Sequence, residues 1–88
     1  MTYMLCKHRV QDFERWHRIF ASHAEEQKKA GLHLLYLLRD TIDPNHIVYL
    51  FRVDNMNTAK GFTETPEASN AAEESGVIGK PEIILLND

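Results

Sequence analysis

Residues 32–53 read LHLLYLLRDTIDPNHIVYLFRV and decide how the chain folds. Two eight-residue runs, 32–39 and 46–53, are rich in leucine, valine, isoleucine and aromatic residues, which is typical of β-strands. Between them, residues 41–45 read TIDPN. This is a turn sequence, because proline presets φ and the flanking aspartate and asparagine bond to the backbone. The stretch therefore predicts an antiparallel hairpin.

The two strands of this hairpin are apolar on both faces. Side chains alternate between the two faces of a strand. The first set is wholly apolar and is expected to lie under helices: Leu32, Leu34, Tyr36, Leu38, Ile47, Tyr49, Phe51 and Val53. The second set is apolar in the middle of each strand and basic at its ends: His33, Leu35, Leu37, Arg39, His46, Val48, Leu50 and Arg52. A sheet with one face in water would instead alternate apolar and polar residues.

Before the hairpin, the sequence predicts a strand at Tyr3–Cys6 and then a helix. Asp12 is placed as its N-cap, and Gly31 follows its last turn as a C′ glycine. At about 100° per residue, one side of this helix is an apolar stripe with Gln27 at its end. The stripe consists of Phe13, Trp16, Phe20, Ala24 and Gln27.

After the hairpin, Asp54 and Asn57 are candidate caps of a second helix. Proline cannot lie deep inside a helix, so Thr65-Pro66-Glu67 predicts a break and a new N-cap. The second helix is therefore expected in two pieces that end at Gly76. Residues 80–88, KPEIILLND, predict the last strand.

The resulting order, β-α-β-β-α-β, predicts a single α+β domain over residues 1–88. It has the ferredoxin-like topology, with a four-stranded antiparallel sheet and both helices on one face. The uncovered face would leave Leu35, Leu37, Val48 and Leu50 in water. An apolar patch of this kind marks an interface.

We therefore expect a homodimer through the sheet faces, since a two-fold self-contact is the commonest assembly. Four basic residues would form its polar rim: His33, Arg39, His46 and Arg52. The alternatives are a monomer with several exposed leucines, or another element that covers this face.

Composition excludes several classes of function. The 88 residues carry a net charge of −3 with scattered basic residues, so we expect no nucleic-acid binding. No apolar run is long enough to span a bilayer, so we expect no membrane association. The single cysteine, Cys6, cannot form an internal disulfide, which agrees with a cytoplasmic protein.

Several short motifs resemble a known family of small dimeric α/β-barrel proteins, often labelled cyclases, related to antibiotic-biosynthesis monooxygenases and aromatic polyketide cyclases. The motifs are V-x-D-F-x-x-W at 10–16, Phe20, His23-Ala24, A-G-L at 30–32, D-P-N at 43–45 and G-V-I-G-K-P-E at 76–82. The resemblance implies a homodimer whose two sheets form a barrel with the helices outside. It also implies a pocket between sheet and helices in each subunit.

This resemblance implies several activities and does not choose among them. The wider group includes cofactor-free oxygenases, cyclases, isomerases, haem enzymes and proteins with no known activity, because one fold supports many functions. The sequence itself contains no glycine-rich phosphate loop and no Cys-x-x-Cys pair. We expect no cofactor.

His23 is the candidate catalytic residue. It lies about 20° around the helix from Trp16 and one turn beyond Phe20, so it can line a pocket walled by these rings. The resembling proteins often have histidine at this position. A histidine near its ordinary pKa could take a proton from a phenol or enol. The alternative is a half-buried helix histidine that bonds to backbone or to a carboxylate.

Five residues are expected to bind the substrate: Trp16, Phe20, Tyr36, Tyr49 and His17. Two tyrosines facing a histidine across a small cavity would form an aromatic site with a few polar groups. These side chains could equally be core residues. His17 and His23 are six positions apart rather than four, so they do not form a helical metal pair, and we expect no metal site.

Two functions of different classes remain. The first is a small cofactor-independent monooxygenase- or cyclase-like protein that acts on or binds an aromatic or polyketide-like molecule, with His23 moving the proton. The second is a non-catalytic dimeric module for ligand binding or assembly. An open cavity with His23 in it favours the first, and a filled interior favours the second.

Overall fold

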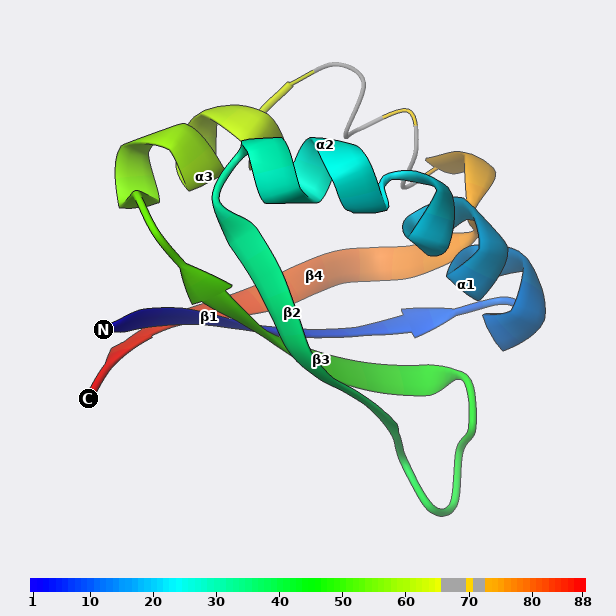
Figure 1. Cartoon of the computed structure of the whole chain (residues 1–88). Coiled ribbons are helices and arrows are strands. Elements are labelled where there is room, and N and C mark those ends of the chain that lie inside the picture. Colours follow the sequence, from blue (N-terminus) through cyan, green and yellow to red (C-terminus); the bar gives the residue numbers. More distant parts are fainter. Residues whose placement is uncertain (66–69, 71–72) are drawn as a thin grey trace.

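The computed structural model describes residues 1–65, 70 and 73–88. The elements in this part of the chain are β1 (Thr2–Val10), α1 (Phe13–Ser22), α2 (Ala24–Lys29), β2 (Leu32–Arg39), β3 (His46–Val53), α3 (Met56–Thr63) and β4 (Val77–Asn87). The strands form one antiparallel sheet in the order β2-β3-β1-β4. All three helices pack over the same face (Figure 1). The predicted α+β class and ferredoxin-like sheet are confirmed.

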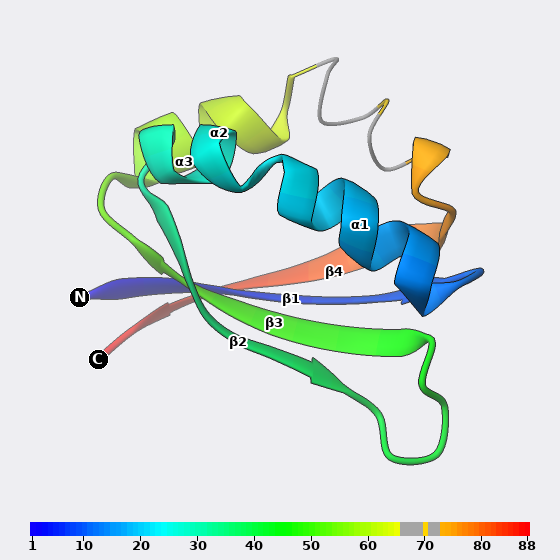
Figure 2. The same cartoon turned by 45° about the vertical axis from the view of Figure 1, so that its right-hand side comes forward.

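The hairpin of residues 32–53 is confirmed with its predicted strand bounds. The outer strands are longer than predicted. β1 continues beyond Cys6 to Val10, and β4 begins at Val77 instead of Lys80. The long β1–β4 pairing brings the two chain ends side by side, and the amide of Asp88 donates to the carbonyl of Met1 (Figures 1 and 2).

The predicted first helix is broken into two, and His23 lies at the break. Asp12 caps α1 as predicted, because its carboxylate accepts from the amide of Glu14. The prediction of one continuous helix is wrong. The hydroxyl of Ser22 donates to the carbonyl of Ile19 at 2.6 Å, and such side-chain bonds compete with the helical ladder. The two helices are visible as separate segments in Figure 2.

Local capping residues set the C-terminal end of α2 and the N-terminal end of α3. Gly31 lies after α2 with φ of 78°, as predicted for a C′ glycine. The predicted caps of α3 are wrong, because Asn55 accepts from the amide of Thr58, while Asp54 bonds to His33. The predicted restart at Pro66-Glu67 lies outside the described residues.

A β-bulge in β2 changes which side chains face the helices. The register with β3 shifts between Leu34 and Tyr36, and a shift of one residue moves every later side chain to the other face. Leu37 therefore pairs with Tyr49 on the helix face. The prediction that Tyr36 faces the helices is wrong, since it is 61% exposed and pairs with Leu50.

The bulge also moves the last two residues of β2. Leu38 pairs with Val48 and lies on the open face, although it was expected under the helices. Arg39 lies on the helix side, with its guanidinium 3.8 Å from the centre of the Phe13 ring. Its predicted place in the rim of the open face is therefore wrong.

The core lies between the helices and the covered face of the sheet. Its buried residues come from every described strand except β4, and from α1 and α3: Met4, Cys6, Val10, Phe13, Trp16, Leu32, Ile47, Phe51, Val53 and Ala59. The opposite face, which we call the open face, has no helix over it in either view (Figures 1 and 2). Its apolar and aromatic residues are Tyr3, Leu5, Tyr36, Leu38, Val48, Leu50, Ile78, Ile84 and Leu86.

Candidate functional site

A cavity of about 420 Å³ lies between the helices and the covered face of the sheet. Its lining comes from all four strands and from α1, α2 and α3, so it is formed by the whole α–β layer rather than by one loop. This volume is within the range of small-molecule sites, roughly 300–1,000 Å³. The structure therefore contains a cavity where a pocket between sheet and helices was predicted.

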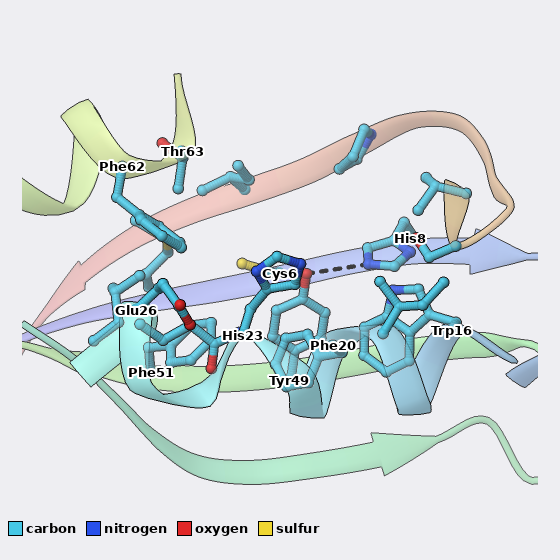
Figure 3. A pocket seen from close by; sticks show the side chains of 18 of the residues that line it. Cys6, His8, Trp16, Phe20, His23, Glu26, Tyr49, Phe51, Phe62 and Thr63 are labelled. Atoms are coloured by element: carbon cyan, nitrogen blue, oxygen red, sulfur yellow. Dashed lines mark hydrogen bonds between the residues drawn. The ribbon is translucent and has the colours of Figure 1, made fainter. Parts of the chain in front are cut away.

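Aromatic rings form one wall of the cavity. Trp16 and Phe20, one turn apart on α1, stack with their ring centres 4.7 Å apart. Tyr49 on β3 meets both rings, at 5.6 Å from Trp16 and 5.1 Å from Phe20. Such an arrangement offers flat apolar surfaces to an aromatic ligand. Figure 3 shows these side chains around the same space as His23.

Three polar side chains lie on the sheet at the floor of the cavity. His8, Cys6 and Tyr49 all line it, and Cys6 and Tyr49 are direct partners across β1 and β3. Nε2 of His8 is 3.1 Å from the hydroxyl oxygen of Tyr49 (Figure 3). His8 is only 7% exposed, and its Nδ1 is buried with no hydrogen-bond partner among the described residues.

Burial keeps all three of these groups uncharged near neutral pH. Burial lowers the pKa of His8. The nearby backbone of Arg9 raises this pKa slightly, and electrostatic repulsion from His46 lowers it further. Burial raises the pKa of the Cys6 thiol to about 11, although a hydrogen bond from Tyr49 opposes the rise. It also raises the pKa of the Tyr49 hydroxyl, and the nearby Cys6 adds to that rise. Desolvation of the charged form is the common cause.

His23 lies in the cavity, as predicted, together with Trp16, Phe20 and Tyr49. It is half-buried at the junction of α1 and α2, where it ends one helix and begins the next. Its backbone amide donates to the carbonyl of Phe20, which fixes the main chain there. The imidazole thus enters the cavity from the helix layer, opposite the floor formed by the sheet.

Two predicted binding residues lie elsewhere. Tyr36 is on the open face, for the reason given above. His17 is exposed and stacks on Phe13, with ring centres 5.3 Å apart. It lines a separate hollow of about 350 Å³ beside Leu34. Neither residue is in contact with the large cavity.

Sequence reasoning missed His8 and the role of Cys6. The signal that could have found His8 is the alternation of Met4, Cys6, His8 and Val10, all of which are buried. Ending the strand at Cys6 hid this pattern, because Lys7 and Arg9 interrupt the apolar run. Alternation of buried and charged residues is typical of a strand with one face in the core and one face in solvent.

The described residues contain no group of histidine, cysteine or acidic side chains arranged to hold a metal ion. In the same part of the chain, no helix combines the length and apolar character that crossing a bilayer requires.

The arrangement has the parts needed to bind and deprotonate a weakly acidic aromatic molecule. The rings supply stacking surface, and the uncharged floor supplies hydrogen-bonding groups in an apolar setting. His23 faces them from a half-buried position, where an imidazole can accept a proton. No lysine or arginine lines the cavity among the described residues, so nothing there neutralises a carboxylate or phosphate.

Solved structures of similar fold span almost the whole chain. A protein from Bordetella bronchiseptica assigned to the antibiotic biosynthesis monooxygenases has a TM-score of 0.78 at 12% identity, covering 99% of this chain and 95% of that chain. One from Caulobacter crescentus with the same assignment has a TM-score of 0.76 at 18% identity, covering 99% and 88%.

SnoaB from Streptomyces nogalater, described as a cofactor-independent oxygenase, has a TM-score of 0.74 at 15% identity, covering 99% of this chain and 91% of that chain. The sequence itself matches no family model and no curated protein. Identities this low carry the fold and not the chemistry. The predicted resemblance is thus confirmed in its fold: this chain has the ferredoxin-like fold of the antibiotic biosynthesis monooxygenases.

Proposed function

We propose that this protein is a small cofactor-independent monooxygenase- or cyclase-like protein whose substrate is an aromatic or polyketide-like molecule. The substrate binds in the 420 Å³ cavity, against Trp16, Phe20 and Tyr49. His23 acts as the proton-transfer residue. The structural likeness to a cofactor-independent oxygenase supports the proposal at the level of fold.

The observation that carries this proposal is the meeting of His23 with three aromatic side chains in one cavity. A filled interior would have favoured a purely structural role for these residues. Removal of a proton from a phenol or enol is a shared first step of oxygenation, cyclisation and isomerisation at such a carbon framework. A base facing an aromatic wall therefore supports all three reactions without choosing among them.

The proposal is tested first by thermal unfolding with a panel of phenols, quinones and anthrones. A ligand that binds only the folded state raises the melting temperature. We expect at least one tricyclic or bicyclic phenol to do so, and Trp16→Ala to abolish the shift. A panel without any shift, for protein that melts cooperatively, would contradict the proposal.

Activity is then tested with the ligands that bind, by oxygen consumption and by product analysis. His23→Ala is expected to lower kcat by roughly 10²–10⁴-fold, the usual contribution of a general base. His17→Ala is the matched control, because His17 lies on α1, the helix that ends at His23, but outside the cavity. Equal rates in both variants would exclude His23 as the base.

We further propose that the open face is covered by a second copy of this chain. The apolar residues of this face come from all four strands, and several are more than a third exposed in one chain. Two copies of one apolar face are complementary by symmetry. The pair Lys7–Glu82, 4.0 Å apart, lies beside this patch and carries both signs of charge.

A further inference from the structure

The proposed proton transfer leaves one deeply buried polar group of the cavity without a role. His8 is on the floor of the cavity, and its Nε2 is within hydrogen-bond distance of the Tyr49 hydroxyl. A buried histidine is normally satisfied at both ring nitrogens. Here Nδ1 is buried and has no partner among the described residues.

This geometry distinguishes the two neutral forms of His8. If Nε2 carries the hydrogen, it donates to the oxygen of Tyr49, and Nδ1 is an acceptor without a donor. If Nδ1 carries the hydrogen, Tyr49 donates to Nε2, and the buried N–H lies near the backbone of Arg9 without forming a well-placed hydrogen bond to it. Buried donors without partners are rarer than buried acceptors without partners. The first form is therefore favoured.

In that form the hydroxyl hydrogen of Tyr49 is not used by His8. The hydroxyl then interacts with the sulfur of Cys6, its cross-strand neighbour. Sulfur is a weak acceptor. An oxygen atom of a ligand in the cavity would replace it as the stronger partner.

We propose that His8 is a positioning residue that turns the hydroxyl of Tyr49 toward the cavity, so that Tyr49 donates a hydrogen bond to an acceptor oxygen of the ligand. This rests on the proposed function, because it requires the cavity to be the ligand site. It adds the orientation of the ligand: an aromatic ketone or quinone would lie with its carbonyl pointing at the sheet.

The lining supports a neutral ligand of this kind. The floor groups are uncharged near neutral pH, and the cavity has no lysine or arginine among the described residues. A carbonyl needs one donor and no counter-ion, whereas a carboxylate in such a place would be left without compensation. The ketone end would thus lie on the floor, and the acidic end would face His23.

The first test needs no ligand. The ¹⁵N chemical shifts of the His8 ring, measured at pH 7.5, report which nitrogen carries the hydrogen. We expect the form with hydrogen on Nε2, and we expect Tyr49→Phe to perturb the Nε2 resonance. Hydrogen on Nδ1 would overturn the proposal, whatever the cavity binds.

The second test is calorimetric titration with 1-tetralone and with tetralin, which lacks only the carbonyl. Tyr49→Phe is expected to weaken 1-tetralone binding about fivefold, the effect of one neutral hydrogen bond. Tetralin binding should be unchanged. An equal effect on both probes, or none on either, would overturn the donor role of Tyr49.

Variants of His8 separate positioning from bulk packing. His8→Leu should weaken 1-tetralone binding about threefold without affecting tetralin, and His8→Gln, which keeps a donor near the Nε2 position, should restore it. If His8→Leu instead strengthens 1-tetralone binding, Tyr49 normally donates to His8 and the proposal is wrong. Melting curves establish that both variants fold.

The outcomes also separate this inference from the proposed function. If wild-type protein binds neither probe nor any phenol, the ligand site fails and this proposal fails with it. If wild-type protein binds both probes and the Tyr49 and His8 variants bind them equally well, only the role of this pair is overturned.

Discussion

The two faces of the sheet are almost equally apolar in sequence, yet they differ in what accompanies the apolar side chains. On the covered face, His8, Tyr49 and Cys6 lie among buried hydrophobic residues and contact one another around a cavity. On the open face, the middle of the sheet is purely apolar, and charged groups such as the Lys7–Glu82 pair lie beside it.

The apolar character of a sheet face is therefore not enough to distinguish a ligand site from an assembly surface. Hydrogen-bonding groups inside a cavity give orientation to a small molecule. A continuous apolar surface with a polar border suits a protein partner. We therefore interpret the covered face as the ligand side and the open face as the dimer side.

The strongest way to break this comparison is a charge on the open face. Leu50→Glu places a carboxylate opposite Leu5 and Tyr36 in the middle of that face. We expect the proposed dimer to weaken more than a hundredfold, because two buried carboxylates would lack partners. Sedimentation equilibrium measures the change.

Ile42→Glu is the matched control, because Ile42 is 91% exposed in the turn between β2 and β3. It should sediment as wild type. Wild-type protein that is monomeric at micromolar concentration would refute the assembly half of the comparison.

Neighbouring residues on one strand sharpen the comparison further. Ile47 faces the core and is 0% exposed, whereas Val48 faces the open side. Ile47→Ala should reduce the free energy of unfolding by about 2–5 kcal/mol at any protein concentration. Val48→Ala should reduce it only where the protein is dimeric. Urea denaturation at two protein concentrations measures the loss of unfolding free energy in each variant. If this loss changed with protein concentration equally in both variants, the assignment of faces would be wrong.

Much of the fold could be predicted, because local patterns decided it. The 32–53 hairpin, the Asp12 cap and Gly31 all follow from turn and capping chemistry within a few residues. The bulge in β2 could not be predicted, since residues 34–38 are apolar on both faces and their register is set by pairing with β3. That single shift moved Tyr36 out of the site.

The candidate site was predicted in part for the same reason. Trp16, Phe20 and His23 lie near one another on the chain, so helical geometry brought them together even though the helix breaks at His23. His8 and Tyr49 meet only across the β1–β3 pairing, 41 residues apart. Such a contact follows from sheet register, which the sequence of β1 alone does not specify.

The reactivity of the Cys6 thiol tests whether a reagent in solution can reach the floor of the cavity. Its thiol is buried and its pKa is raised to about 11, so very little thiolate exists at pH 8. We expect a disulfide reagent to react with native protein at least a hundredfold more slowly than with urea-unfolded protein. Ile42→Cys in a Cys6→Ser background is the exposed control and should react at the unfolded rate. Fast reaction of native Cys6 would show that the floor opens readily.

The smallest expected effect is the pH dependence from His8. Its pKa in the folded protein lies below the ordinary 6.5, so the unfolded chain takes up the proton first. The stability that this group contributes is complete above pH 6.5 and is lost as the pH falls toward the folded pKa. Wild type should lose stability relative to His8→Gln between pH 7 and 5, by at most about 1.4 kcal/mol per pH unit. Parallel curves from urea denaturation would contradict the burial of a neutral imidazole.

One titration tests directly whether the covered face binds ligand and the open face does not. Methyl NMR spectra recorded during addition of 1-naphthol report on both faces at once. We predict that shifts are concentrated at Met4, Ile19 and Leu32, which line the cavity, while Leu38 and Leu50 on the open face do not move. Shifts at Leu38 and Leu50 without shifts of the cavity methyls would show that the ligand binds the open face and would contradict this assignment of the two faces.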